Sequence, residues 1–272
     1  MSSPSSTPTC CLLAIALVAL PGCGSKLIRL GDQAADVSAA GRGGTAAAGA
    51  NAAGGDPGVG AGGDDGAAGG NDTCPRAPVS ASQVLWIGDS WIQIPGTQHS
   101  RVRELARAAG TIAADEDYVD VAAAASSMAA VAQQYDTRQS GAVKVKVLLM
   151  DGGTWDPIAA QMAGASVPAA IDSAIGAFQQ FLAKVASDGT VEHLVYFLVP
   201  ELATIPGVGS MRPRLRQACA ESSVPCHFID LQPYWEGHPE YTAPDGIQSS
   251  EAGAIVIANS IWATMQENCI AQ

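Results

Sequence analysis

Two short segments near opposite ends of the sequence carry residues that could take part in nucleophilic chemistry. In the first, the apolar run 84–87 leads into a Gly-Asp-Ser sequence that ends at Ser90. A serine directly after a buried strand exposes its hydroxyl as a nucleophile, and its backbone N–H can bind an oxyanion. In the second, Asp245 and Gln248 stand three residues apart in a turn that opens the last helix. Because a carboxamide takes up no proton near neutral pH, Gln248 cannot be the general base for Ser90.

These segments resemble the first and last sequence blocks of the SGNH (GDSL-type) hydrolases, which use a serine nucleophile and an Asp-x-x-His pair. The resemblance covers residues 74–272 in element order, and Gln248 stands where the family has its histidine. It implies a serine ester hydrolase that acts on acetyl or short acyl esters, including those on glycans, and that needs no cofactor. The alternative, which the glutamine favours, is a catalytically inactive member that binds a glycan or acyl ligand.

The two middle blocks of the family supply oxyanion donors, and both depart from the family pattern here. After the second strand the family has a glycine N–H, whereas this chain has alanines followed by serines, and Ser127 is the expected donor. After the third strand the family has Gly-x-Asn-Asp, whereas this chain has Gly153, Thr154 and Trp155. Depending on the register, the asparagine is replaced by the Thr154 hydroxyl or by the Trp155 indole N–H. The alternative is that the glycines form only a tight turn.

The four histidines of the chain are the candidates for a replacement base. His238 lies on the loop that leads into the last block and is the candidate substitute base, with an exposed loop histidine as the alternative. His99, His193 and His227 are expected to be exposed or structural. Gln248 itself could instead orient a water molecule or bind a sugar hydroxyl.

Apolar, β-branched runs alternate with helical patterns in the folded part of the chain. Strands are expected at 83–87, 118–123, 143–150, 191–199 and 226–230. Helices are expected at 100–109, 127–135, 168–187, 209–222 and 249–268. This alternation predicts a three-layer α/β/α fold of flavodoxin-like type, with a five-stranded parallel sheet between two layers of helices. Active sites in such folds lie at the carboxyl ends of the strands, and the loop 91–98 is expected to cover them.

The first 73 residues are expected to export and tether the protein. Residues 1–22 contain an apolar run too short to span a bilayer permanently, which predicts a cleaved signal peptide. The sequence from Leu20 to Cys23 resembles a bacterial lipobox, which implies a lipid on Cys23; an ordinary secretory signal is the alternative. Residues 23–73 are rich in Gly and Ala and predict a flexible linker. We therefore expect an exported lipoprotein of the cell envelope, facing the periplasm or on the cell surface.

Charge and cysteine content narrow the range of partners. A net charge of −12 and the lack of a Lys/Arg cluster argue against nucleic-acid binding. Outside the signal and the lipobox the cysteines are even in number, which fits an oxidising compartment. Their places among the expected elements predict the bridges Cys219–Cys226 and Cys74–Cys269, and their spacing does not predict a metal site. We expect a monomer whose partners are an ester substrate and the membrane.

Overall fold

The computed structural model describes Cys74, residues 79–94 and residues 96–272. The expected signal peptide (1–22), the lipidation site Cys23 and the linker (23–73) lie outside the described residues. In the part of the chain that is described, no helix is both long enough and apolar enough to cross a membrane.

A single parallel sheet forms the centre of residues 79–272. Its strands are β1 (Val84–Ile87), β2 (Val119–Asp120), β3 (Val147–Met150), β4 (His193–Leu198) and β5 (Cys226–Asp230). They lie in the order β2-β1-β3-β4-β5, and every neighbouring pair is parallel. All residues of β1 and β3 are buried, because helices cover both faces of the sheet. Removing each large apolar side chain of these strands from water contributes about 1.5–3 kcal/mol.

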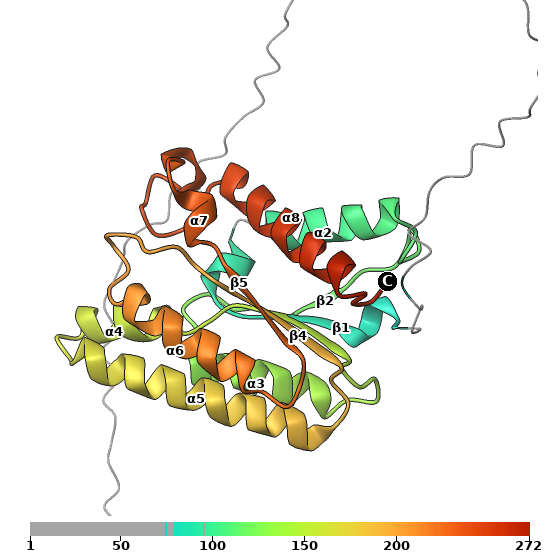
Figure 1. The fold of residues 1–272 in the computed structure, drawn as a ribbon, viewed down its shortest axis with the longest axis horizontal. Coiled ribbons are helices and arrows are strands. Elements are labelled where there is room, and N and C mark those ends of the chain that lie inside the picture. Colours follow the sequence, from blue (N-terminus) through green and yellow to red (C-terminus); the bar gives the residue numbers. More distant parts are fainter. Residues whose placement is uncertain (1–73, 75–78, 95) are drawn as a thin grey trace, which may run out of the picture. The chain divides into compact units, whose positions relative to one another are not determined.

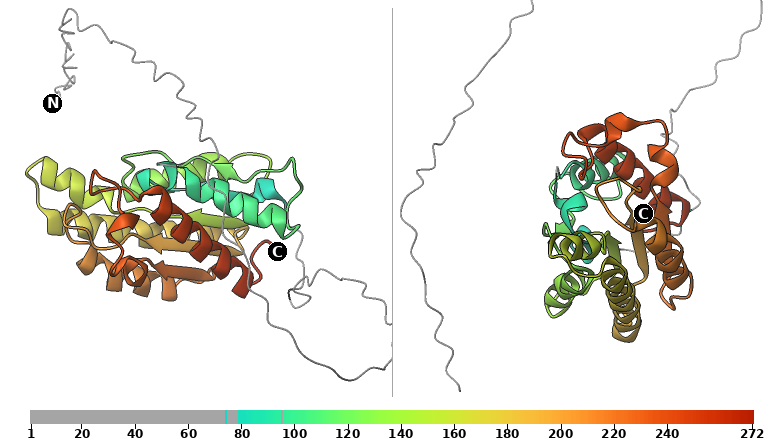
Figure 2. Two further views of the ribbon diagram at one scale, coloured as in Figure 1. Left: turned by 90° about the horizontal axis from the view of Figure 1, so that it is seen from above. Right: turned by 90° about the vertical axis from the view of Figure 1, so that its left-hand side faces the viewer.

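Helices form a layer on each face of the sheet (Figure 1). They are α1 (Ser90–Gln93), α2 (Thr97–Ala108), α3 (Met128–Gln139), α4 (Trp155–Met162), α5 (Val167–Asp188), α6 (Val208–Ala220), α7 (Gln232–Trp235) and α8 (Glu251–Glu267), with 3-10 turns at Ala81–Gln83 and Pro239–Tyr241. Helices α2 and α8 lie side by side on one face, as Figure 2 also shows, and α3, α5 and α6 cover the other. This is the predicted three-layer α/β/α fold.

The structure departs from the sequence prediction mainly at the carboxyl ends of the strands. The loop expected at 91–98 begins instead with α1, because the Asp89 carboxylate accepts the N–H of Trp91 and caps this turn (3.0 Å). Helices α4 and α7 were not predicted either. Strand β2 is shorter than expected, although Val121 and Ala123 still donate backbone hydrogen bonds to the first strand and its following turn. These short elements shape the edge of the sheet where the candidate site lies.

Both predicted disulfides are present in the structure. Cys74 is bonded to Cys269, and Cys219 is bonded to Cys226, with Cα–Cα distances of 5.4 and 5.3 Å. The first bridge joins the chain just before β1 to the end of α8, so it ties the last helix to the amino-terminal edge of the sheet. That edge lies opposite the candidate site.

Removing the Cys74–Cys269 bridge should destabilise the protein more than removing Cys219–Cys226. The bridges span sequence separations of 195 and 7 residues. In the chain-entropy description, closing the longer loop stabilises by about 5 kcal/mol and the shorter one by about 2.5 kcal/mol. Urea denaturation of the Cys74→Ser/Cys269→Ser and Cys219→Ser/Cys226→Ser variants measures this difference. Equal losses, or a larger loss for the shorter loop, would contradict it.

Candidate active site

Ser90 lies at the carboxyl edge of the sheet, as the first residue of α1. Strand β1 ends at Ile87, and the chain turns through Gly88 and Asp89 before α1 begins. Gly88 has φ +156°, and a Cβ at this position would collide with the Asp151 carboxyl group and with Ile92. Only glycine fits here, because the turn packs directly against the end of β3.

Asp89 holds the turn that carries Ser90. Its Oδ1 accepts the Trp91 N–H at 3.0 Å, and its Oδ2 accepts the Thr154 hydroxyl at 3.0 Å. Its own N–H donates to Asp151 Oδ1 at 2.8 Å. Asp89 is buried with all three contacts made, so its side chain is engaged in structure and is not directed at a substrate.

Gln248 comes from the other end of the chain and contacts the hydroxyl of Ser90. Its Nε2 donates to Ser90 Oγ at 2.8 Å. Asp245 Oδ1 accepts the backbone N–H groups of Ile247 and Gln248 at 2.8 and 2.9 Å, which fixes the turn. A β-bridge between Thr242 and Ser249 closes the base of the same loop. The sequence prediction brought Ser90, Asp245 and Gln248 to one place, and the structure joins Ser90 to Gln248 directly. The hydrogen bonds of Asp245 are to backbone N–H groups.

Two glutamines that sequence reasoning missed hold the site together. Gln134 of α3 accepts the Gly88 N–H at 2.8 Å and donates to the Gly88 carbonyl at 2.9 Å. Gln98 of α2 is fully buried and donates to the Trp91 carbonyl and to Ser249 Oγ, at 2.6 and 3.3 Å. The signal for Gln98 is a polar residue on the buried face of an amphipathic helix. Gln134 carries no comparable signal.

The expected oxyanion donors are differently arranged. The Ser127 side chain caps α3 by accepting the Ala130 N–H at 3.3 Å, and its backbone N–H stays the expected donor. The Thr154 hydroxyl is buried and donates to Asp89, so it is not available to an oxyanion. Gly153 has φ +89°, and Trp155 is the half-buried first residue of α4. Of the two replacements considered for the family asparagine, the Trp155 indole N–H is the one left open.

None of the four histidines hydrogen-bonds to Ser90. His238, the candidate substitute base, interacts with Glu240 Oε1 at 2.9 Å and stacks on the Tyr241 ring with a centroid distance of 4.6 Å. His99 contacts the Tyr118 carbonyl, and His193 pairs with His227 at 3.2 Å within the sheet. Burial lowers the pKa of both His193 and His227. The side chain that hydrogen-bonds to Ser90 Oγ is therefore the Gln248 amide.

Two further acidic side chains, Asp151 and Asp156, lie near the turn formed by Gly88, Asp89 and Ser90. Asp151, at the end of β3, is fully buried, and burial and the nearby Asp89 raise its pKa well above the usual range. Burial also raises the pKa of Asp156, whose Oδ2 accepts the Met128 N–H at 2.9 Å. In the described residues, no three or more His, Cys, Asp and Glu side chains are grouped to hold a metal ion.

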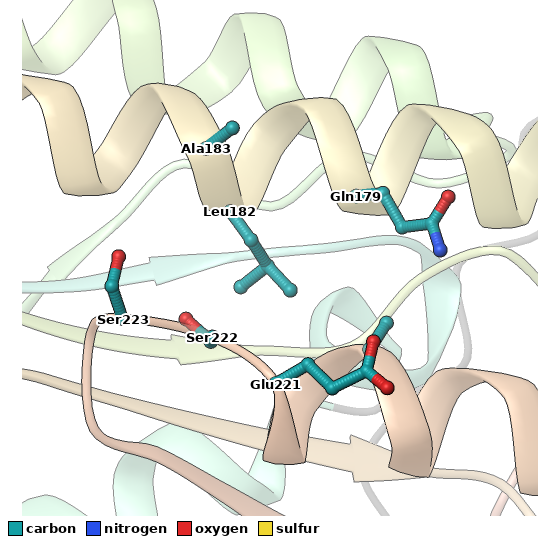
Figure 3. A pocket seen from close by; sticks show the side chains of 7 residues that line it. Gln179, Leu182, Ala183, Glu221, Ser222 and Ser223 are labelled. Atoms are coloured by element: carbon teal, nitrogen blue, oxygen red, sulfur yellow. The ribbon is translucent and has the colours of Figure 1, made fainter.

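Two pockets lie away from Ser90. A pocket of about 340 Å³ lies between α5 and the end of α6 (Figure 3). Its lining residues are Gln179, Leu182, Ala183, Ala218, Glu221, Ser222 and Ser223. A second pocket of about 370 Å³ lies near Gln139 and Lys184. Neither contains a residue of the Ser90 site, whose hydroxyl is half-exposed at the edge of the sheet.

Comparison with known proteins establishes the fold. The sequence matches no protein-family model and no curated protein. Among solved structures it is similar to LAE5, an alpha/beta hydrolase enzyme from the metagenome of Lake Arreo, Spain, with a TM-score of 0.55 and 17% identity over 71% of this chain and 97% of that one. The acetyl xylan esterase AlAXEase gives a TM-score of 0.55 with 13% identity over 66% and 98% of the two chains.

A third similar structure is Axe2, an acetylxylan esterase from Geobacillus stearothermophilus, with a TM-score of 0.50 and 15% identity over 69% of this chain and 94% of that one. Two forms of Axe2 described as catalytic mutants have a histidine or a serine replaced by alanine. At these identities the likeness is one of fold, and this chain spans nearly the whole length of each of these enzymes.

Replacing Gly88 with alanine should damage the site far more than the same change at another glycine with positive φ. Gly88→Ala forces a methyl group into the Asp151 carboxyl, and Gly110→Ala is the matched control, with φ +70° and no atom within 4 Å of the added Cβ. The control should lose about 1–2 kcal/mol of unfolding free energy from the backbone alone. Gly88→Ala should lose at least about 2 kcal/mol more, measured by urea denaturation. Equal losses in the two variants would mean that the turn does not pack on β3 as described.

Proposed function

We propose that residues 74–272 form an SGNH-type serine hydrolase domain that cleaves acetyl or short acyl esters, those on glycans included, with Ser90 as nucleophile. The observation that carries this proposal is the 2.8 Å hydrogen bond between Gln248 Nε2 and Ser90 Oγ at the carboxyl edge of the sheet. It joins the family's serine block to the position of the family's histidine. The esterases of the same fold support this reaction class.

Each residue of the site has its own role in the proposed reaction. Ser90 Oγ attacks the ester carbonyl. The backbone N–H of Ser90 is an oxyanion donor, because Ser90 lies where a strand ends and a helical turn begins. The Trp155 indole N–H and the Ser127 backbone N–H are the further candidate donors. The Gln248 amide keeps the Ser90 hydroxyl in place but accepts no proton near neutral pH. Asp245 fixes the turn that presents Gln248.

Without an imidazole, the proton of Ser90 must pass to solvent. In serine triad enzymes, losing the base leaves about 10³–10⁴-fold catalysis over water, from the oxyanion site and substrate binding. We therefore propose slow hydrolysis for this domain. Its rate depends on how well the turn holds Ser90 and the ester together.

The second candidate function is binding of a glycan or acyl ligand without turnover. The observation that favours it is Gln248 Oε1, which is buried and has no hydrogen-bond partner among the described residues. A buried acceptor without a partner costs about 1–3 kcal/mol, and a ligand hydroxyl that donates to it would recover this. A sugar hydroxyl has this chemistry.

We also propose that the domain works outside the cytoplasm, held at the cell envelope by a lipid on Cys23 and the linker 23–73. The two disulfides support an oxidising compartment, where such bonds persist. The lipobox-like sequence before Cys23 supports the anchor.

Introducing the missing base should raise esterase activity. Gln248→His places an imidazole at a position whose side chain contacts Ser90 Oγ, and hydrolysis of an activated acetyl ester should rise by at least about tenfold, equivalent to about 1.4 kcal/mol of transition-state stabilisation. The measurement is kcat/KM for p-nitrophenyl acetate with the unmodified protein and the variant. Ser90→Ala in the variant background is the control and should abolish the gain.

The outcomes separate the two candidate functions. A gain that survives Ser90→Ala would rule out Ser90 as nucleophile. An efficient unmodified protein that Gln248→His leaves unchanged would mean that another base acts, and His238→Ala would then remove the activity. If neither form hydrolyses the ester, the hydrolase proposal fails and ligand binding is the function to test.

Lipid attachment has its own test. Mass spectrometry of the membrane fraction should identify an acylated peptide that begins at Cys23. Cys23→Ser should release the protein into the soluble fraction without changing its esterase activity. A mature protein that begins elsewhere and lacks lipid would remove the tether.

A further inference from the structure

Asp151 is a buried carboxyl group to which the proposed reaction assigns no role. It directly follows the last residue of β3 and is 0% exposed. Its Oδ1 accepts the Asp89 N–H at 2.8 Å, whereas its Oδ2 is buried without a partner among the described residues. No Lys, Arg or His forms a salt bridge with it in residues 79–94 and 96–272. Burying an ionised carboxylate that has no cation and an unpaired oxygen costs much more free energy than burying a neutral carboxyl group.

The charged group that faces Asp151 is Asp89 in the Gly88–Ser90 turn, and its negative charge raises the pKa of Asp151. Asp156 on α4 lies near Asp89. Tyr196 on β4 is neutral, because burial raises the pKa of its hydroxyl well above the usual range, and this hydroxyl donates to the Gly152 carbonyl at 2.8 Å. It therefore does not stabilise a charge on Asp151. The Asp89 carboxylate accepts two hydrogen bonds, from the Trp91 N–H and the Thr154 hydroxyl. Two adjacent buried carboxyl groups do not both ionise near neutral pH.

We propose that Asp151 is a positioning residue that keeps its proton in the folded protein at neutral pH and, as a neutral carboxyl group, fixes the turn that carries Ser90. Its Oδ1 accepts the Asp89 N–H. In this proposal the proton sits on Oδ2 and donates to the adjacent Asp89 carboxylate, which supplies the partner that an ionised Oδ2 lacks. This pair of opposed hydrogen bonds sets the direction of Asp89 and, through it, the place of the next residue. The effect on turnover rests on the proposed hydrolase function; the protonation state and the contact do not.

Loss of this proton should release the turn. Because the pKa of Asp151 is raised in the folded protein, its contribution to stability is complete below about pH 3.9, the pKa of an unfolded aspartate. That contribution decreases as the pH rises toward the folded-state value, because the unfolded chain then binds fewer protons than the folded one. Ionisation would place two negative carboxylates together beneath Ser90.

The test compares full-length wild type with Asp151→Asn and Asp151→Ala. An asparagine keeps an acceptor for the Asp89 N–H and a donor for its carboxylate, whereas alanine removes both. The urea midpoint of wild type should fall relative to that of Asp151→Asn as the pH is raised from about 4 to about 9. The ¹⁵N–¹H signal of Asp89 in folded wild type should stay fixed from about pH 4 to neutral pH, because the folded Asp151 keeps its proton while the unfolded one loses it. Urea midpoints of the two proteins that change in parallel with pH, or an Asp89 signal that titrates below neutral pH in wild type but not in Asp151→Asn, would overturn the proposal.

The effect on turnover is measured in the Gln248→His background. Asp151→Ala should lower kcat by at least about tenfold with KM unchanged, and Asp151→Asn should restore it to within about threefold. Equal loss in both variants would mean that the ionised form is needed, which contradicts the proposal. If no form hydrolyses ester, the hydrolase function has failed, and the urea and NMR comparison still decides the state of Asp151. If Asp151→Ala does not fold, wild type and Asp151→Asn carry the test.

Discussion

The contact between the Gly-Asp-Ser turn and the end of β3 is the constraint on which the site depends. Gly88 lacks a side chain so that the turn can approach the Asp151 carboxyl group, and the Asp89 N–H then donates to that group at 2.8 Å. This approach sets the start of α1 and therefore the direction of Ser90. Gln134 fixes the same turn from the helix layer by bonding both backbone groups of Gly88. Ser90 is thus held by a strand end and a helix and not by a free loop.

The position of Gln248 determines which parts of the proposed catalysis the site can supply. The Gln248 amide lies at hydrogen-bond distance from Ser90, which joins segments far apart in the sequence. In the proposed hydrolase this glutamine stands at the position of the family's imidazole and keeps a hydrogen bond, but it cannot move a proton. The proposed site therefore supplies positioning without general-base catalysis. Positioning and charge stabilisation still accelerate acyl transfer, which is why slow hydrolysis and ligand binding are both consistent with one site.

Sequence reasoning predicted the fold because its signals are strong. Strands such as Val84–Ile87 are apolar throughout, since helices bury both their faces, and the disulfide pairs follow from the order of the elements. Helix α1 was missed because it has only four residues and depends on the Asp89 cap, for which periodicity gives no signal.

The polar contacts of the site could not be predicted from sequence. Gln134 bonds backbone atoms 46 residues away, and no local pattern marks such a pair. Asp151 follows an apolar strand directly before two glycines, and no local pattern shows that it is buried against the Gly88–Asp89 turn, 62 residues away. Thr154 was predicted as a possible oxyanion donor on the basis of the family pattern, but its hydroxyl donates to Asp89.

The most direct test of a positioned serine without a base is the pH dependence of its labelling by a fluorophosphonate. Mass spectrometry of the unmodified protein should locate the label on Ser90. The labelling rate should rise by about tenfold per pH unit through neutral pH, because hydroxide removes the proton. A rate that levels off above about pH 6.5, where an imidazole becomes neutral, would mean that a histidine activates Ser90 and would contradict this account. A label on another residue, or none at any pH, would contradict the assignment of Ser90 itself.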